Sequence, residues 1–417
     1  KIDMPRKQFL ATFSLLSILT VLFFAGGANS QAIQPPTSGG DPLILGAVDA
    51  GREVQISGDT MLIIELESNP ATGYTWEVVD LNNQVLKLTD NVLSTSNKAS
   101  LNDTPLLGAS QTQVLRFAGL RAGKSKVELV YHRAWEQNAV PLKTYSVSVN
   151  VLEAFNGTYA PLEEAEQQLV EMDSVQQSSQ TLSLPTSYNW CDHNGCTAVK
   201  DQGNCGSCWA FGTVAPLESA IRLTDGQTKD LSEQYLVSCN TDDWGCDGGW
   251  WAHDYHQWKK PTGESDAGAV YEADSPYTAT DGYCNSPYTH HEKITDWAYV
   301  GSSSGVPSTD AIKQAIYDYG PVAAAVCVNT SFQNYSGGIF TGPGCTSVNH
   351  AIVLVGWDDA NEAWILRNSW GPNWGEDGYM RIEYNVSQVG YSANYISYEG
   401  AGPEPTPIPP TPTPGAT

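Results

Sequence analysis

The sequence from Gln202 to Phe211 reads QGNCGSCWAF, and in it a turn-forming segment gives way to a helix that begins near Cys208. Downstream of that cysteine, apolar residues recur at the spacing of one helix face: Phe211, Val214, Leu217 and Ile221. A thiol at a helix N-terminus faces unpaired backbone N–H groups and the positive end of the helix dipole. Because both favour the thiolate, which is the reactive form, Cys208 is the candidate nucleophile.

The residues around Cys208 suit that role. Gly206 and Ser207 are small and leave room for a substrate backbone. Gln202 can place a side-chain amide where an oxyanion would form. The alternative is that Cys205 and Cys208 form a redox or metal-binding Cys-x-x-Cys pair. No thioredoxin-like strand precedes them and no second Cys/His pair at metal spacing follows, which disfavours that alternative.

The pattern Cys-Gly-Ser-Cys-Trp at 205–209 resembles the signature of the papain-like cysteine peptidases. The resemblance extends from about Leu184 to Tyr398 and implies an α+β fold of two lobes, with a peptidase domain over 184–399. It also implies a cysteine-type endopeptidase. The helical lobe is expected at about 184–289 and the β lobe at about 294–398.

Two downstream residues complete the expected catalytic set of Cys208, Gln202, His350 and Asn368. His350 follows Cys208 by 142 positions (350 − 208) and opens an apolar strand, a setting that the other six histidines lack. A lone histidine is more often structural than catalytic. Asn368 lies in an Asn-Ser-Trp-Gly motif. The resemblance implies that Asn368 accepts a hydrogen bond from the His350 imidazole and that Trp370 shields this bond from water.

The resemblance also implies a set of substrate-binding residues. A Gly248-Gly249 pair is expected to hydrogen-bond the substrate backbone, since glycine permits close approach. Four residues match the pocket that receives the P2 side chain, and they suggest a bulky apolar preference: Trp250, Trp251, Ala325 and Val348.

All nine cysteines lie between Cys191 and Cys345, and an odd number fits one free thiol and four disulfides. Spacing alone leaves 105 possible pairings of eight cysteines. The resemblance implies the pairs Cys205–Cys246 and Cys239–Cys284. For the remaining cysteines we guess Cys191–Cys196 and Cys327–Cys345. Disulfides indicate an oxidising compartment.

Residues 43–155 differ in character from the peptidase half. Short stretches of alternating apolar residues, separated by Asn, Asp and Gly, predict an all-β sandwich. Three of its loops resemble the inhibitory loops of the chagasin-like inhibitors of papain-type peptidases. In that family an immunoglobulin-like sandwich presents three loops as a wedge that enters the active-site cleft. The matching residues are Asn69, Pro70, Ala71, Thr72 and Gly73 in the first loop, Gly108 in the second, and Arg133 and Trp135 in the third. Taken alone, the first loop is an ordinary Asn-Pro turn.

The remaining segments are expected to be a signal peptide and connecting segments. Residues 1–30 have a basic start, an apolar run from Phe9 to Ala25 and a small-x-small cleavage site at Ala28-Asn29-Ser30, which indicate secretion. A retained anchor is the alternative. Linkers are expected at 31–42 and 156–183, and a Pro/Thr-rich tail at 400–417.

The formal net charge of −25 disfavours nucleic acids and anionic membranes as partners. No metal or nucleotide motif is present, so no cofactor is expected. We expect a secreted, extracellular monomer that acts on peptides or proteins, or a cell-surface or periplasmic one if the signal or tail is retained. The β domain is expected to inhibit its own enzyme in cis or another peptidase in trans. The alternatives are a protein that works mainly as an inhibitor, and a peptide ligase that uses the same acyl-enzyme.

Overall fold

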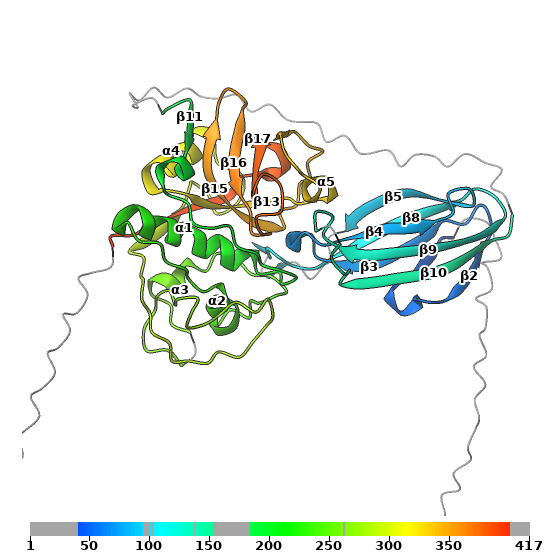
Figure 1. The fold of residues 1–417 in the computed structure, drawn as a ribbon, viewed down its shortest axis with the longest axis horizontal. Helices are drawn as coiled ribbons and strands as arrows, with labels where there is room; N and C mark the ends of the chain where they lie inside the picture. Colours follow the sequence, from blue (N-terminus) through cyan, green and yellow to red (C-terminus); the bar gives the residue numbers. More distant parts are fainter. Residues whose placement is uncertain are drawn as a thin grey trace, which may run out of the picture.

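The computed structural model describes residues 41–94, 100–101, 104–136, 138–153, 184–261 and 263–400. In Figure 1 they form a β sandwich that meets a two-lobed domain at one end. The expected signal peptide, the acidic linker, and all but the edges of the first linker and the tail lie outside the described residues.

The expected β sandwich is confirmed, as two four-stranded sheets with strand orders β1-β3-β8-β5 and β2-β10-β9-β4. Apolar residues alternate inward along each strand and meet between the sheets, which is why the segments fold as strands. The strands are β1 Leu43–Leu45, β2 Glu53–Ile56, β3 Leu62–Ser68, β4 Thr75–Leu81, β5 Leu86–Ser94, β8 Gln111–Gly119, β9 Gly123–His132 and β10 Lys143–Val151. A short pair, β6 Ser100–Leu101 and β7 Thr104–Pro105, lies outside these sheets.

Strand register brings the three expected inhibitory loops to one end of the sandwich. Ser68 at the end of β3 pairs with Gln111 at the start of β8. Thr75 at the start of β4 pairs with His132 at the end of β9. The loop after β3, the loop before β8 and the loop after β9 therefore emerge side by side. This is the end of the sandwich that faces the two-lobed domain in Figure 1.

The two-lobed domain is built around α1 Cys208–Asp225, in which every residue from Cys208 to Ile221 is buried. This helix packs against β15 of the second lobe, so it lies between the lobes. The other helices are α2 Glu233–Cys239, α3 His253–Gln257, α4 Thr309–Tyr319 and α5 Thr330–Gln333. Ser232 caps α2 through its side chain, as its position before the helix predicts.

The second lobe is an eight-stranded sheet with the order β12-β18-β13-β15-β16-β17-β14, in which β11 also pairs with β15. Its central strands are continuous apolar runs because both faces are covered. The strands are β11 Ser187–Asn189, β12 Asp296–Tyr299, β13 Val322–Val326, β14 Ile339–Phe340, β15 His350–Asp358, β16 Ala363–Arg367, β17 Tyr379–Glu383 and β18 Tyr391–Ser397.

Two buried histidines, His253 and His256, lie on α3. The His253 Nε2 atom lies 2.7 Å from the Asn394 Oδ1 atom, whereas neither ring nitrogen of His256 has a hydrogen-bond partner. Burial lowers the pKa of His253 to about 4 and that of His256 to about 3. Both rings are therefore neutral at pH 7.

These histidines predict a loss of stability in acid. Their unfolded pKa near 6.5 is higher than the folded values, so the unfolded chain binds more protons as the pH falls below 6.5. Stability is complete above that value and decreases towards pH 4, by roughly 3 kcal/mol for one such histidine. Urea unfolding at pH 7, 5.5 and 4 should give a shallower acid decline for His256→Leu than for the wild type. Equal declines in the two proteins would contradict the prediction.

Candidate active site

Cys208 is the first residue of α1, is fully buried, and is the one cysteine of the nine that is not in a disulfide. The other eight pair as Cys191–Cys196, Cys205–Cys246, Cys239–Cys284 and Cys327–Cys345, the same pairs that the sequence analysis named. The second of these joins the loop before Cys208 to the segment that leads to Gly248 and Gly249. The nucleophile loop and the glycine pair are thereby held together.

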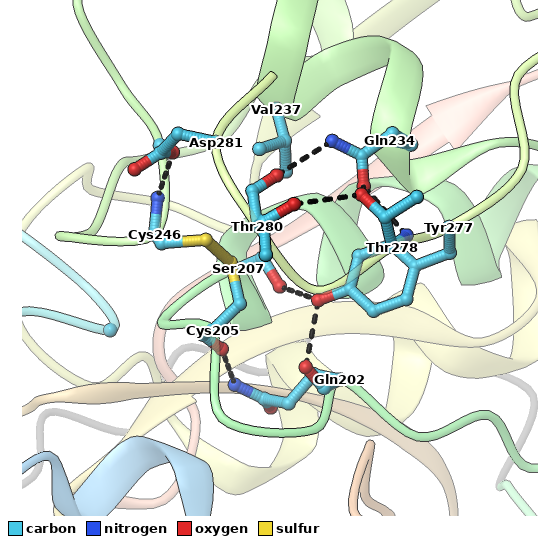
Figure 2. The surroundings of a disulfide bond; sticks show 12 residues. Gln202, Cys205, Ser207, Gln234, Val237, Cys246, Tyr277, Thr278, Thr280 and Asp281 are labelled. Carbon is cyan, nitrogen blue, oxygen red and sulfur yellow. Dashed lines mark hydrogen bonds between the residues drawn. A yellow bond between two sulfur atoms is a disulfide. The ribbon is translucent and has the colours of Figure 1, made fainter.

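The loop before Cys208 is further fixed by Tyr277, which sequence reasoning missed. Figure 2 shows the Tyr277 hydroxyl between two points of this loop: it donates to the Gln202 carbonyl at 2.8 Å and lies 2.6 Å from the Ser207 hydroxyl. Across the disulfide, the Cys246 N–H donates to the Asp281 carboxylate at 2.7 Å. No sequence motif identifies Tyr277 or Asp281, and only the fold brings them to the loop before Cys208.

Gln202 is fully buried and ties the nucleophile loop to the second lobe. Its Nε2 atom donates to the Cys205 carbonyl at 2.9 Å, and its Oε1 atom accepts from the Ser369 hydroxyl at 2.7 Å. Since a side-chain amide carries two N–H donors, one remains for a further acceptor. The fixed amide can therefore serve an oxyanion without first changing its existing bonds.

His350 and Asn368 meet at the start of β15 and just after β16. The His350 Nε2 atom lies 2.8 Å from the Asn368 Oδ1 atom, and the Trp370 ring stacks on the imidazole with a centroid distance of 5.0 Å. Because an amide oxygen can only accept, Nε2 carries the proton and Nδ1 presents a lone pair. The Nδ1 atom is buried without a hydrogen-bond partner. The Ala351 backbone acts to lower the pKa of the Cys208 thiol, so the sulfur lies near the end of β15 that His350 opens.

Burial controls the charge of both groups. It raises the pKa of the Cys208 thiol to about 12 and lowers the pKa of His350 to about 4. At neutral pH the site therefore holds a thiol and a neutral imidazole. The thiolate favoured by the helix N-terminus is absent in this arrangement because loss of solvent outweighs the helix dipole.

The first loop of the sandwich lies directly over this site. Ala71 is fully buried in the same apolar cluster as Cys208, and its carbonyl accepts from the Trp370 indole N–H at 2.7 Å. The Gln333 Nε2 atom donates to the Pro70 carbonyl at 3.2 Å and to the Tyr74 carbonyl at 3.3 Å. The loop therefore closes the site from solvent.

The second loop pairs with the glycine segment of the peptidase domain. Leu107 and Gly249 exchange both backbone hydrogen bonds, at 2.9 and 3.0 Å. The Gly108 N–H donates to the Asn349 carbonyl at 2.8 Å, one residue before His350. A Cβ on Gly108 would lie 1.9 Å from the Gly206 carbonyl oxygen, so only glycine fits there.

The third loop provides a buried charge and a stacked ring. Arg133 is almost fully buried, and it donates to the Asp201 carboxylate at 2.9 Å and to the Gly203 carbonyl at 2.9 Å. The Trp135 ring stacks on Trp370 with a centroid distance of 5.5 Å and an interplanar angle of 15°. Figure 1 shows the sandwich loops reaching the junction of the two lobes.

The pocket residues named from the sequence belong to the same apolar cluster as Leu107 of the second loop. Leu107 is fully buried in one apolar cluster with Trp251, Ala325 and Val348, and Trp250 packs against that cluster. Gly73 of the first loop, with φ of +79°, would place a Cβ 2.3 Å from the Trp135 ring. Asn69 and Thr72 are buried in the first loop, and Gly248 lies against Leu107 and Ala109.

Asp201, Gln333 and Asn349 make these interdomain bonds but were not identified from the sequence. Asn349 and Asp201 each had a local signal, since they precede His350 and Gln202 in the sequence, whereas Gln333 had none. Within the described ranges, no group of three or more His, Cys, Asp or Glu side chains is arranged to hold a metal ion. None of the described helices combines the length and apolar character required to cross a bilayer.

A free, buried cysteine begins a helix, and a histidine held by an asparagine begins the strand on which that helix packs. These features define the class of cysteine proteases. Residues 184–399 match the model of the papain family of cysteine proteases, and the chain belongs to that family. Residues 55–149 match the chagasin family of peptidase inhibitors, so the peptidase domain is fused to a domain of that type.

Known relatives share mainly the peptidase half. The cysteine proteinase COT44 of Brassica napus is 40% identical over 210 residues, which cover 49% of this chain and 61% of that protein. Ananain of Ananas comosus is 34% identical over 286 residues, 66% of this chain and 77% of that protein. Among solved structures, the bromelain protease of Ananas comosus in complex with the E64 inhibitor matches 52% of this chain and 100% of its own at 30% identity, with a TM-score of 0.45.

Proposed function

We propose that the chain is a secreted papain-like cysteine endopeptidase that is held latent by its own β domain. One observation carries the proposal: the buried Cys208 thiol shares an apolar cluster with Ala71 of the first loop and Leu107 of the second, and α1, which it begins, packs on β15, the strand that His350 opens. The catalytic roles below belong to the enzyme after the β domain has left the cleft.

In the open enzyme, solvent returns to the site, and proton transfer from Cys208 to His350 generates the thiolate–imidazolium pair. The thiolate attacks a peptide carbonyl, and the oxyanion is stabilised by the Cys208 backbone N–H and the Gln202 amide. His350 then protonates the leaving amine, and water hydrolyses the thioester. Asn368 orients the imidazole and Trp370 covers their hydrogen bond.

Latency follows from occupancy and from charge. The second loop uses the Gly249 backbone groups that a substrate would need, and the first loop excludes the solvent that would stabilise the ion pair. Arg133, Leu107 and Trp135 contact the peptidase domain of the same chain, which favours inhibition in cis. For inhibition of another peptidase in trans, the same loops would first have to leave their own cleft.

Export is supported by chemistry that is independent of the site. Four disulfides in one domain require an oxidising compartment, and the first 30 residues have the composition of a signal peptide. We infer an extracellular location, with peptides and proteins as substrates.

An active-site titration tests the proposal. The full chain and a chain cut in the segment 154–183, from which the β domain has been removed, are treated with a thiol-directed epoxide at pH 6.5. We expect one equivalent of label on Cys208 of the trimmed enzyme and little on the full chain. Equal labelling of both would rule out latency, and no labelling of either would rule out a reactive cysteine.

The pocket around Leu107 predicts the P2 preference of the freed enzyme. An apolar side chain fills this buried cluster in the latent chain, so peptides with Leu, Val or Phe at P2 should be cleaved fastest. A P2 peptide library assayed by kcat/KM checks this. A preference for Asp or Glu at P2 would contradict it.

A further inference from the structure

The second loop lies in the cleft as a substrate backbone would. Two reciprocal hydrogen bonds join Leu107 to Gly249, and the next N–H, that of Gly108, donates to Asn349. A Cβ on Gly206 would lie 2.0 Å from the Gly108 carbonyl oxygen, so the two backbones touch two residues before Cys208. The peptide bond from Gly108 to Ala109 is therefore the one presented to the nucleophile, and the chain carries a potential cleavage site within its own inhibitor.

The Gly108 carbonyl, however, already accepts a hydrogen bond from another loop of the β domain. The Asn69 Nδ2 atom of the first loop donates to the Gly108 carbonyl oxygen at 2.6 Å. The backbone of Asn69 is fixed from both sides, since its N–H donates to the Tyr131 hydroxyl at 2.8 Å and its carbonyl accepts from the Thr72 hydroxyl at 2.6 Å. The amide is thus held in place before the second loop is engaged.

The other end of the Asn69 side chain is not satisfied. Its Oδ1 atom is buried and has no hydrogen-bond partner. Leaving a buried acceptor unpaired costs on the order of 1–3 kcal/mol, so general packing does not account for this orientation. What the orientation does achieve is the bond to Gly108.

The backbone conformation of Gly108 also turns its carbonyl towards Asn69. Gly108 has a φ of +89°, a region that residues with a side chain rarely adopt. A substrate residue at this position would leave the N–H in place but direct its carbonyl differently. The positive φ turns the Gly108 carbonyl towards Asn69, while the Gln202 amide bonds to Cys205.

We propose that Asn69 is a positioning residue that protects the second loop from cleavage, because its amide holds the Gly108 carbonyl away from the oxyanion donors Cys208 and Gln202. This inference rests on the proposed function, since it requires an active nucleophile. The prevented step is ordinary hydrolysis. The Cys208 thiol would pass its proton to His350 as the sulfur bonds to the Gly108 carbonyl carbon. The bond to the Ala109 nitrogen would then break, and that nitrogen would take the proton from His350. Water would then release Gly108 as a carboxylate and restore the thiol.

The test uses the full chain with Asn69→Leu and Asn69→Ala. Leucine has nearly the same shape as asparagine, no N–H to donate and no charge, so it removes the bond without placing a carboxylate in the interface. Each protein is incubated at pH 6.5, and peptide mapping follows a new C-terminus at Gly108 and a new N-terminus at Ala109. We expect this cut to form about tenfold faster or more in the variants than in the wild type. Cys208→Ala in the Asn69→Leu background should abolish it.

A matched control separates protection from loosening. Gln333→Met removes the two hydrogen bonds that Gln333 donates to the carbonyls of Pro70 and Tyr74 but leaves the bond between Asn69 and Gly108. The Gln333→Met chain should cleave the peptide bond between Gly108 and Ala109 no faster than the wild-type chain does.

Three results would overturn the proposal: Asn69 variants that gain activity while the Gly108–Ala109 bond stays intact, variants that stay latent and intact, or an equal cut in Gln333→Met. Failure of the proposed function is recognised separately, because the trimmed wild-type enzyme would then take no epoxide label. Near-UV circular dichroism verifies the fold, and the Asn69→Leu variant keeps the test valid if Asn69→Ala unfolds.

Discussion

Replacing Cys208 by alanine will lower the kcat of the freed peptidase by about 10⁵-fold or more, the size of effect produced by removal of an activated nucleophile. Alanine has no atom that can form the acyl bond, so neither His350 nor Gln202 has a step to assist. The assay is hydrolysis of a fluorogenic peptide with leucine at P2, after linker cleavage and removal of the β domain. A residual rate within tenfold of the wild type would end the assignment of Cys208 as nucleophile.

Cys208→Ser provides the matched control for that loss. Serine keeps the shape and a polar atom at the same position, but its hydroxyl ionises far less readily than a thiol. It should be nearly as inactive as alanine and should take no epoxide label. Both variants should keep the thermal stability of the wild type, since no hydrogen bond of the fold depends on an ionised sulfur.

Local chemistry made the elements of the site predictable from the sequence. A turn followed by helical periodicity located the start of α1 at Cys208, and an apolar run after a polar loop located the start of β15 at His350. The Asn368 contact followed from family resemblance and not from any local pattern.

The interface was less predictable, because its residues are brought together only by the fold. Gln333 lies on a helix of four residues and contacts Pro70, which precedes it by 263 positions. The ion pair between Asp201 and Arg133 of the third loop could not be predicted from the sequence around either residue. Such pairs form only when the loop end of the sandwich docks in the cleft of the peptidase domain. The sequence pattern of neither domain predicts that docking geometry.

The charge state of Cys208 also could not be predicted from the sequence. A helix N-terminus stabilises a negative charge by about 0.3–1 kcal/mol when exposed, and this favoured a thiolate. Full burial shifts a pKa by as much as 3–5 units, which corresponds to about 4–7 kcal/mol. The second effect is larger, so the pKa of the covered thiol rises to about 12. Only the structure reveals that the thiol is covered.

Leu107→Asp in the full chain will release the activity that the β domain suppresses. The carboxylate would have to enter an apolar cluster with no cation to pair it, at a cost of several kcal/mol. A cost of about 4 kcal/mol lowers the docking equilibrium by about 10³-fold. The kcat/KM of the uncut variant should therefore rise by up to that factor, towards the value of the trimmed enzyme.

Leu120→Asp is the control for this release, because Leu120 is exposed and lies between β8 and β9 at the far end of the sandwich. It adds the same charge to the same domain and should leave the full chain latent. If both variants were released equally, added charge or loss of the sandwich fold would explain the result. If neither were released, the second loop would not be what closes the cleft, and latency would have to come from the buried Arg133 and the stacked Trp135 of the third loop.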